Sequence, residues 1–377
     1  MQIRAAVLRE AGLARPYDVS RPIELETLEL DPPGPGELLV RVRAVGLCHS
    51  DLSTLDGTRP RPTPMALGHE AAGEVAELGV GVSGFARGDH VVMTFVPSCG
   101  SCAHCRHGRP ALCEPGARAN GTGELLGTGR RLRRAGGEEV HHHLGVSGFS
   151  DHVVVSERSA VPIDPELPWE IAALFGCAVL TGVGAVVNAA RVDVGDAVAV
   201  FGLGGVGLSA LLGAVAAGAH PILATDLSEE KLALARELGA THALDARGDV
   251  VAEIRALTDR GVQHAIETVG NADVLAQAYA ATCRGGTTTT VGLPHPSASL
   301  SIPAVSLTAE ERRLQGCYLG SCVPSRDVPR FVALYRAGKL PVDRLLTCTL
   351  RQDEINEGFE RLARGEGVRQ VVVFDGA

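Results

Sequence analysis

The alternation of hydrophobic and polar residues changes character along the chain. Up to about residue 178, short apolar runs such as 38–46 (LLVRVRAVG) and 90–93 (HVVM) are separated by Pro and Gly, which is typical of strands joined by turns. From about residue 194, the strand-like runs AVAVFG and PILATD alternate with LSALLGAVAAGA and KLALARELGA, which have the length and periodicity of helices. Strands that alternate with helices at this pitch predict an α/β fold with a parallel, doubly wound sheet.

The pattern becomes mixed again after about residue 318. FVALYRAGKL and INEGFERLARG have helical patterns, and VRQVVVF predicts a closing strand. We therefore predict a β-rich catalytic domain over 1–178, a nucleotide-binding Rossmann domain over 179–318, and a return to the catalytic domain over 319–377. The Gly- and Arg-rich segment 120–145 shows no regular period, so we expect an irregular surface loop there.

Composition narrows the possible functions. The formal net charge of −9 and the pI near 5.8 argue against a broad nucleic-acid-binding surface. No apolar run is long enough for a membrane span, and the charges in MQIRAAVLREAG argue against a secretory signal. We therefore expect a cytoplasmic protein, in which cysteines are more often thiols or metal ligands than disulfides.

A glycine-rich turn marks a nucleotide site. In GLGGVG (202–207), Gly202, Gly204 and Gly207 have the G-x-G-x-x-G spacing, directly after a predicted strand and before a predicted helix. Asp226 ends the next predicted strand, where it can accept hydrogen bonds from the adenosine ribose of a dinucleotide. Its charge would repel a 2′-phosphate, so we predict NAD in preference to NADP.

Four clustered cysteines predict one closed metal site. Cys99, Cys102, Cys105 and Cys113 occupy the lobe 97–115 with spacings that differ from the ferredoxin iron–sulfur run. Four thiolates from one short segment suit a tetrahedral structural zinc, which has no open position for a substrate. A redox thiol cluster is the alternative.

A second, open metal site would need ligands from elsewhere in the chain. Cys48 lies in GLCHSD, His69 in GHEAAG and Cys177 in FGCAVLTG. Two thiolates and one imidazole leave the fourth coordination position of zinc free, which is the catalytic arrangement. The spacing alone does not join these three residues, and each one by itself could be a buried thiol or a core histidine.

A family resemblance joins them. GHEAAGEVAELGVGV (68–82) resembles the zinc signature G-H-E-x2-G-x5-G-x2-V of the medium-chain alcohol dehydrogenases, in the class III-like, NAD-dependent bacterial branch. GLCHSD, the cysteine lobe, FGCAVLTG and GLGGVG follow in that family's order, so the resemblance covers nearly the whole chain. It implies a GroES-like catalytic domain beside the Rossmann domain, with NAD and two zinc ions per chain. Cys48, His69 and Cys177 match the catalytic zinc ligands.

The resemblance also implies roles for residues near the zinc. Ser50 matches the hydroxyl that receives the substrate proton, and Asp51 matches the carboxylate that orients the zinc-bound histidine. Glu70 matches a carboxylate that can approach the metal, and His49 matches a contact to the pyrophosphate. Ser53 stands where some members carry the histidine that ends the proton relay, so the relay would run from Ser50 through a cofactor ribose hydroxyl to water, with a path through His49 as the alternative.

The remaining implied contacts belong to the cofactor and the substrate. The resemblance implies these cofactor-binding residues: His49, Thr181, Gly202, Gly204, Gly205, Val206, Gly207, Asp226, Lys231, Val269, Val291, Leu293 and Arg369. Ser50, Phe95 and Leu293 match substrate-pocket positions. The alternatives are that Lys231 and Arg369 are solvated charges and that Phe95 and Leu293 are core residues. Asp51 and Glu70 could likewise be polar surface residues. For the run 141–143 (HHH), no second ligand group is placed to close a metal site.

The implied reaction is oxidation of an alcohol, primary and either aliphatic or aromatic, to the aldehyde by hydride transfer to NAD, and the reverse. The enzyme would act on small molecules as a homodimer or homotetramer. One alternative is a formaldehyde dehydrogenase that needs a mycothiol or glutathione adduct, although Ala117 stands where glutathione-dependent members carry an arginine. Another is a nicotinoprotein whose NAD does not dissociate. A catalytically silent NAD-binding regulator would be a different class, but all three open-site ligands are present.

Overall fold

The computed structural model describes residues 1–374, which divide into two units. The first unit contains Met1–Cys177, Val323–Arg330 and the chain from Leu346 onward, and the second contains Ala178–Cys322 and Phe331–Leu345.

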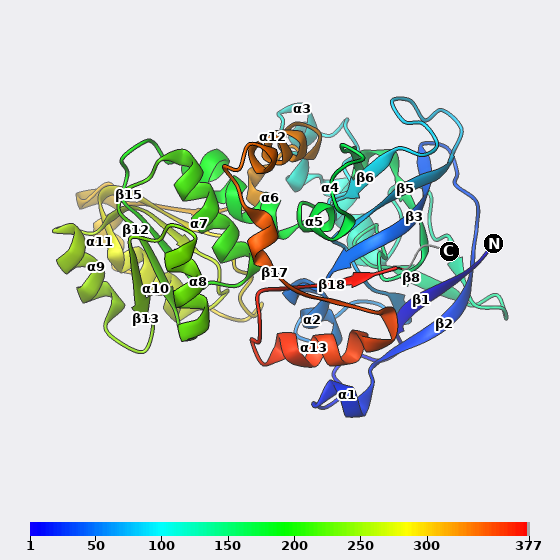
Figure 1. Cartoon of the computed structure of the whole chain (residues 1–377), viewed down its shortest axis with the longest axis horizontal. Helices are drawn as coiled ribbons and strands as arrows, with labels where there is room; N and C mark the ends of the chain where they lie inside the picture. Colours follow the sequence, from blue (N-terminus) through cyan, green and yellow to red (C-terminus); the bar gives the residue numbers. More distant parts are fainter. Residues whose placement is uncertain (375–377) are drawn as a thin grey trace. The chain divides into compact units, whose positions relative to one another are not determined.

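A closed barrel and an open sheet form the first unit (Figure 1). The barrel strands follow the order β1 (Gln2–Leu8), β2 (Ile23–Leu30), β7 (Leu132–Arg133), β8 (Glu139–His142) and β4 (Met65–Ala66). The open sheet has the order β10 (Ala160–Pro162), β6 (His90–Met93), β5 (Ala71–Leu78), β3 (Glu37–Gly46), β18 (Arg369–Val373) and β17 (Leu346–Leu350), with β9 (His152–Ser156) also paired to β3.

Strand β3 is the centre of the open sheet. Its apolar run is nearly continuous because the strand is buried over most of its length, and β5, β9 and β18 all pair with it. Val40, Val42 and Leu47 pack in the main core of the unit together with Phe149 and Phe359. Residues far apart in sequence therefore meet around this strand.

Short helices complete the first unit. They are α1 (Tyr17–Ser20), α2 (His49–Leu55), α3 (Ala103–Arg106), α4 (Glu114–Thr122), α5 (Trp169–Leu174), α13 (Ile355–Ala363) and the 3-10 turns η1 (Pro110–Leu112), η2 (Glu157–Ser159) and η6 (Gln352–Glu354). Helix α12 (Pro324–Arg336) has residues in both units.

A parallel sheet forms the second unit and confirms the predicted doubly wound fold. The strand order is β13 (His242–Asp245), β12 (Ile222–Asp226), β11 (Val198–Phe201), β14 (Val262–Glu267), β15 (Thr282–Thr290) and β16 (Arg313–Gly316), and each neighbouring pair is parallel. This is the 3-2-1-4-5-6 order of dinucleotide-binding sheets. The helical segments are α6 (Ala178–Gly184), the π-helical turn η3 (Ala185–Ala190), α7 (Gly205–Ala217), α8 (Glu229–Glu237), α9 (Val250–Thr258), α10 (Ala272–Ala281), α11 (Ala304–Ala309), η4 (Leu319–Ser321) and η5 (Val342–Leu345).

The C-terminal boundary differs from the sequence-based expectation. All of 319–377 was expected in the catalytic domain, but 319–322 and 331–345 belong to the second unit. Val342 and Leu345 are buried in that unit, and Arg344 pairs with Glu237 at 2.6 Å. The helical pattern of this stretch does not reveal which unit it packs on.

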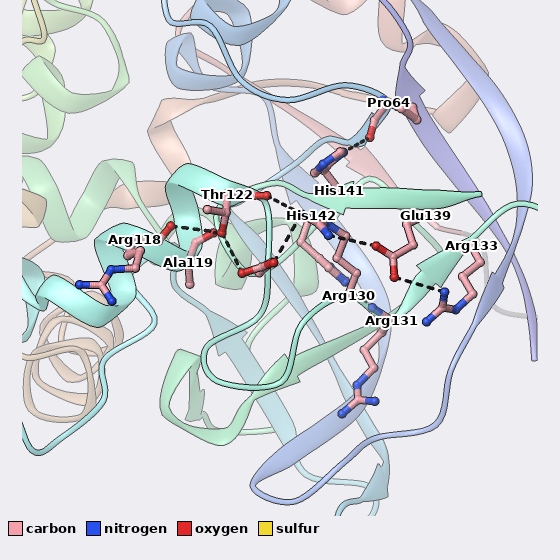
Figure 2. Close-up of polar contacts among 11 residues, drawn as sticks. Pro64, Arg118, Ala119, Thr122, Arg130, Arg131, Arg133, Glu139, His141 and His142 are labelled. Carbon is pink, nitrogen blue, oxygen red and sulfur yellow. Dashed lines mark hydrogen bonds and ion pairs between the residues drawn. The ribbon is translucent and has the colours of Figure 1, made fainter. Parts of the chain in front are cut away.

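The segment 120–145 is more ordered than the expected irregular loop. Its strands β7 and β8 pair with each other and, through β2 and β4, help to close the barrel. Figure 2 shows Arg130 and Arg133 both bound to Glu139, with N–O distances of 3.0 and 3.2 Å. Strands of two and four residues are too short to show a hydrophobic alternation, so only the Gly- and Arg-rich composition is visible in the sequence of this segment.

Among residues 1–374, no helix combines the length and the apolar surface that crossing a membrane requires.

The His142 ring should give the first unit a pH-dependent stability. Burial, with the guanidinium groups of Arg130 and Arg131 nearby, lowers the pKa of His142 to about 3. The unfolded chain, with an ordinary histidine pKa of about 6.5, binds a proton that the folded chain excludes, so stability falls as the pH decreases below that value. Between pH 7 and 5 the contribution lost is about 2 kcal/mol.

The variant His142→Gln keeps an acceptor for the Arg131 N–H and lacks the titrating ring. Between pH 7 and 5, the free energy of unfolding in urea should decrease for both proteins, but the decrease should be about 2 kcal/mol smaller for the variant than for the wild type. The same pH dependence in both proteins would contradict this assignment.

Candidate active site

The start of helix α2 places the first group of site residues. Cys48 ends the extended chain after β3 and is the N-cap of α2, with a φ of −133°. Ser50 and Asp51 follow in the first helical turn, where the helix dipole favours a negative charge. Cys48 and Asp51 are buried, whereas Ser50 is half-buried and His49 is exposed.

The G-H-E motif precedes strand β5, and its glycine has a clear structural reason. Gly68 has a φ of +98°, and a Cβ atom there would lie 2.5 Å from the backbone nitrogen of Phe149. Only glycine fits this close approach, and it brings the next residue, His69, into the core. Its ring contacts Phe95 edge to face, with 5.5 Å between the centroids.

Residues from three separate motifs converge in the first unit. The ligand atoms of four buried side chains all lie within 4.8 Å of one another: Cys48, His69, Glu70 and Cys177. A hydrogen bond from Cys177, assisted by the His69 ring, lowers the pKa of Cys48 well below its ordinary value. The same bond and burial raise the pKa of Cys177.

This donor set fits zinc. Two sulfurs and one imidazole nitrogen are the ligands of a catalytic zinc site, and burying thiolate charge without a cation would be costly. The Glu70 Oε1 atom is buried and has no hydrogen-bond partner among the described residues. Cys48, His69 and Cys177 can hold the ion, with Glu70 beside them.

A buried arginine neutralises the Glu70 side of the site. The Nη2 group of Arg369, from strand β18, donates a hydrogen bond to Glu70 Oε2. Burial raises the pKa of Glu70 to about 8, while Arg369 acts in the opposite direction. Arg369 is only 4% exposed and forms an ion pair with Glu70, so it is not a solvated charge. Its contact to the pyrophosphate stays a prediction.

The Asp51 carboxylate supports His69 from behind. The Nδ1–H group of His69 donates to Asp51 Oδ1 at 3.1 Å, which leaves Nε2 of His69 available to a metal. The same Oδ1 atom accepts the backbone N–H of Gly68 at 3.1 Å. The side chain of His143 also reaches this carboxylate, with Nδ1 3.1 Å from Oδ1. The contact of His143 with Asp51 could not be predicted from the sequence. His143 belongs to the HHH run at 141–143, and nothing in that run indicates that Asp51 lies beside it.

The cysteine lobe forms a second cluster in the first unit. The sulfur atoms of its four members lie within 4.8 Å of one another: Cys99, Cys102, Cys105 and Cys113. The backbone N–H of Cys102 donates to the sulfur of Cys99 at 3.2 Å, and that of Cys99 donates to the sulfur of Cys113 at 3.2 Å. None of the cysteines forms a disulfide in the described chain. The cluster resembles a structural zinc site.

The nucleotide motif lies in the second unit, at the carboxyl end of β11. Gly202 follows the strand with a φ of +88°, and a Cβ atom on Gly207 would lie 1.8 Å from the Gly202 carbonyl oxygen. Asp226 ends β12 and accepts the N–H of Leu203 at 2.7 Å, so its carboxylate borders the glycine turn. This is the strand–turn–helix context that the dinucleotide motif requires.

Most of the other predicted cofactor residues also lie in the second unit, whereas His49 and Arg369 lie in the first. Thr181 is buried in α6, and Lys231 is in the first turn of α8. Val269 and Leu293 are about half exposed, at 52% and 50%, so Leu293 is not a core residue. In the first unit, Phe95 is 7% exposed and lies beside His69.

Known proteins agree with this arrangement. The model of the alcohol dehydrogenase GroES-like domain matches residues 34–165, and that of the zinc-binding dehydrogenases matches residues 205–337. The geraniol dehydrogenase of Castellaniella defragrans is 40% identical over 374 residues, which cover 98% of this chain and 97% of that protein. The chain belongs to the zinc-binding alcohol dehydrogenases.

Solved structures of this family are closely similar. An alcohol dehydrogenase zinc-binding domain protein from Burkholderia ambifaria has a TM-score of 0.94 and 36% identity, with all of both chains covered. Benzyl alcohol dehydrogenase from Acinetobacter calcoaceticus has a TM-score of 0.93 and 33% identity, again over both whole chains. This alcohol dehydrogenase accordingly uses zinc and a nicotinamide cofactor to oxidise small-molecule alcohols. The thiol-dependent, nicotinoprotein and regulator alternatives gain no support from these relatives.

Loss of a ligand should remove one zinc. In the variant Cys48→Ser a hydroxyl replaces the thiolate, so we expect the zinc content to fall from about two to about one per chain and turnover to fall by about 1000-fold or more. Plasma mass spectrometry of the metal and steady-state kinetics measure both effects. The matched variant Cys283→Ser removes a buried thiol of β15 and should keep both ions. Full zinc content in Cys48→Ser would contradict the ligand assignment.

Proposed function

We propose that this enzyme oxidises primary alcohols, aliphatic or aromatic, to aldehydes with NAD, using a zinc ion held by Cys48, His69 and Cys177. The proposal is based on the convergence of these three buried ligand atoms and on the hydrogen bond between His69 and Asp51. A bound zinc would act as a Lewis acid that lowers the pKa of the alcohol.

The chain's own groups orient this chemistry and move the proton. Asp51 fixes the His69 ring so that Nε2 is directed to the ligand cluster. The half-buried Ser50 hydroxyl receives the proton of the alcohol, and the exposed imidazole of His49 passes it to solvent. Ser53 is not part of the proposed relay; its hydroxyl donates to the His49 carbonyl oxygen at 2.8 Å.

The cysteine lobe is the proposed site of the second zinc ion. We assign the second zinc to Cys99, Cys102, Cys105 and Cys113, where four thiolates leave no open position. This ion orders a lobe that has only short helices of its own.

The substrate class is proposed from the chemistry shared by two relatives. Geraniol and benzyl alcohol, for which the relatives are named, are both primary alcohols whose carbinol carbon adjoins an sp² carbon. Phe95, which lies edge-on to His69, offers an apolar surface for such a group.

An alcohol panel tests this directly. We expect kcat/KM for benzyl alcohol and geraniol to exceed that for ethanol by at least about 100-fold, because extra apolar contact lowers the transition-state energy by a few kcal/mol. NADH absorbance reports turnover, and a parallel assay with formaldehyde and glutathione or mycothiol tests the thiol-dependent alternative. A preference for the thiol adduct would overturn the proposed substrate class.

The choice of cofactor is proposed from Asp226. Its carboxylate ends β12 beside the glycine turn, where it would accept hydrogen bonds from the ribose and repel a 2′-phosphate. The remaining second-unit contacts proposed for NAD are Thr181, Gly202, Gly204, Gly205, Val206, Gly207, Lys231, Val269, Val291 and Leu293.

A charge-removing variant tests the cofactor proposal. Asp226→Asn keeps an acceptor for the Leu203 N–H, and the ratio of kcat/KM for NADP over NAD should rise by about tenfold or more, equivalent to about 1.4 kcal/mol. Asp249→Asn is a matched control, because asparagine also caps helix α9 and this carboxylate is not assigned to the cofactor. An unchanged ratio in Asp226→Asn would refute the role of its charge.

We further propose a homodimer or homotetramer in the cytoplasm. The family resemblance supports the oligomer, which light scattering measures. The six proposed cysteine ligands must remain reduced to bind zinc, which supports a reducing compartment.

A further inference from the structure

A second imidazole contacts the carboxylate that orients the proposed zinc ligand His69. Asp51, His69 and His143 are all fully buried, with exposed fractions of 0%, 1% and 1%. The Oδ1 atom of Asp51 lies 3.1 Å from Nδ1 of each ring. The two rings meet edge to face, with centroids 5.5 Å apart.

The backbone holds His143 in this place. Strands β8 and β4 run parallel with Ala66 opposite His142, so His143 lies level with the residues that lead into the G-H-E motif. The N–H group of His143 donates to the Ser147 hydroxyl at 3.0 Å, and its carbonyl oxygen accepts the N–H groups of Val146 and Ser147. These backbone contacts fix the position of the buried ring.

The neighbours of the ring determine what it can donate. The ring of His143 is buried, and its Nδ1 atom lies 3.1 Å from Asp51 Oδ1 with no other partner among the described residues. A neutral imidazole carries one N–H group, and beside a carboxylate that proton belongs on Nδ1, so that Nε2 becomes an acceptor. Nε2 lies 3.4 Å from the hydroxyl of Thr54 on helix α2, so the ring contacts the helix that carries Asp51 from the segment that follows β8.

We propose that His143 is a positioning residue of the catalytic zinc site: it shares the Asp51 carboxylate with His69 and so fixes the orientation of that ligand. The proposal rests on the ligand set proposed above. Without His143, Asp51 keeps only the Gly68 N–H and His69 as partners, and its Oδ2 atom already has no hydrogen-bond partner in the described chain. A carboxylate with fewer fixed donors can rotate, and the histidine that it supports rotates with it.

The test measures how fast zinc leaves the purified, fully loaded enzyme. In His143→Phe, which keeps the ring and loses both nitrogens, a chelator should remove one of the two zinc ions about 10- to 100-fold faster than from the wild type. His143→Asn places an amide N–H near the position of Nδ1 and should restore most of the slow release. A structural role of the ring alone would favour the phenylalanine variant over the asparagine variant.

A neighbouring histidine provides the matched control. His142, the last residue of β8, precedes His143 in sequence and is equally buried, but its Nε2 accepts the backbone N–H of Arg131 at 3.1 Å. His142→Phe should lower the thermal midpoint without changing zinc release. In the cobalt-substituted enzyme, the visible spectrum of the catalytic ion should shift in His143→Phe and stay unchanged in His142→Phe.

The outcomes separate this inference from the function on which it rests. Wild-type enzyme that holds only one zinc, in the cysteine lobe, would refute the proposed ligand set. Two zinc ions with wild-type release from His143→Phe, or equally fast release from His142→Phe and His143→Asn, would refute the role of His143 alone.

Discussion

The meeting of two thiols and one imidazole in a dry interior is the constraint on which the active site depends. Cys48, His69 and Cys177 come from a helix N-cap, a strand entry and a turn between helices, and each is nearly inaccessible to water. Removing thiolate charge from water is costly unless a cation compensates it. Metal binding and folding of the first unit are therefore coupled through the same three side chains.

Two buried carboxyl groups, Asp51 and Glu70, flank this cluster. On one side Asp51 accepts from Gly68 and His69 and contacts His143, and on the other Glu70 pairs with Arg369. Both carboxylates are fully buried, so their partners decide whether they remain ionised. The proposed metal site is thus flanked by two carboxyl groups that are themselves held in place by neutral or cationic neighbours.

Local signals in the sequence predicted more of this enzyme than non-local ones. The glycine turn at 202–207, Asp226 and the spacing of the cysteine lobe are each contained in one short segment, so their chemistry could be predicted directly. The grouping of Cys48, His69 and Cys177 needed the family resemblance, because chain folding brings them together. His143, strands β7 and β8, and the pairing of Arg369 with Glu70 depend on which strands become neighbours, and no single segment encodes that.

Strand β18 has a consequence for the folding of the first unit. It lies between β3 and β17 in the open sheet and carries Arg369, which is 299 residues away in sequence from its partner Glu70. Contacts of such large sequence separation carry the highest entropic cost of loop closure and contribute to slow folding. The counter-charge of Glu70 therefore depends on one of the most non-local contacts in the first unit.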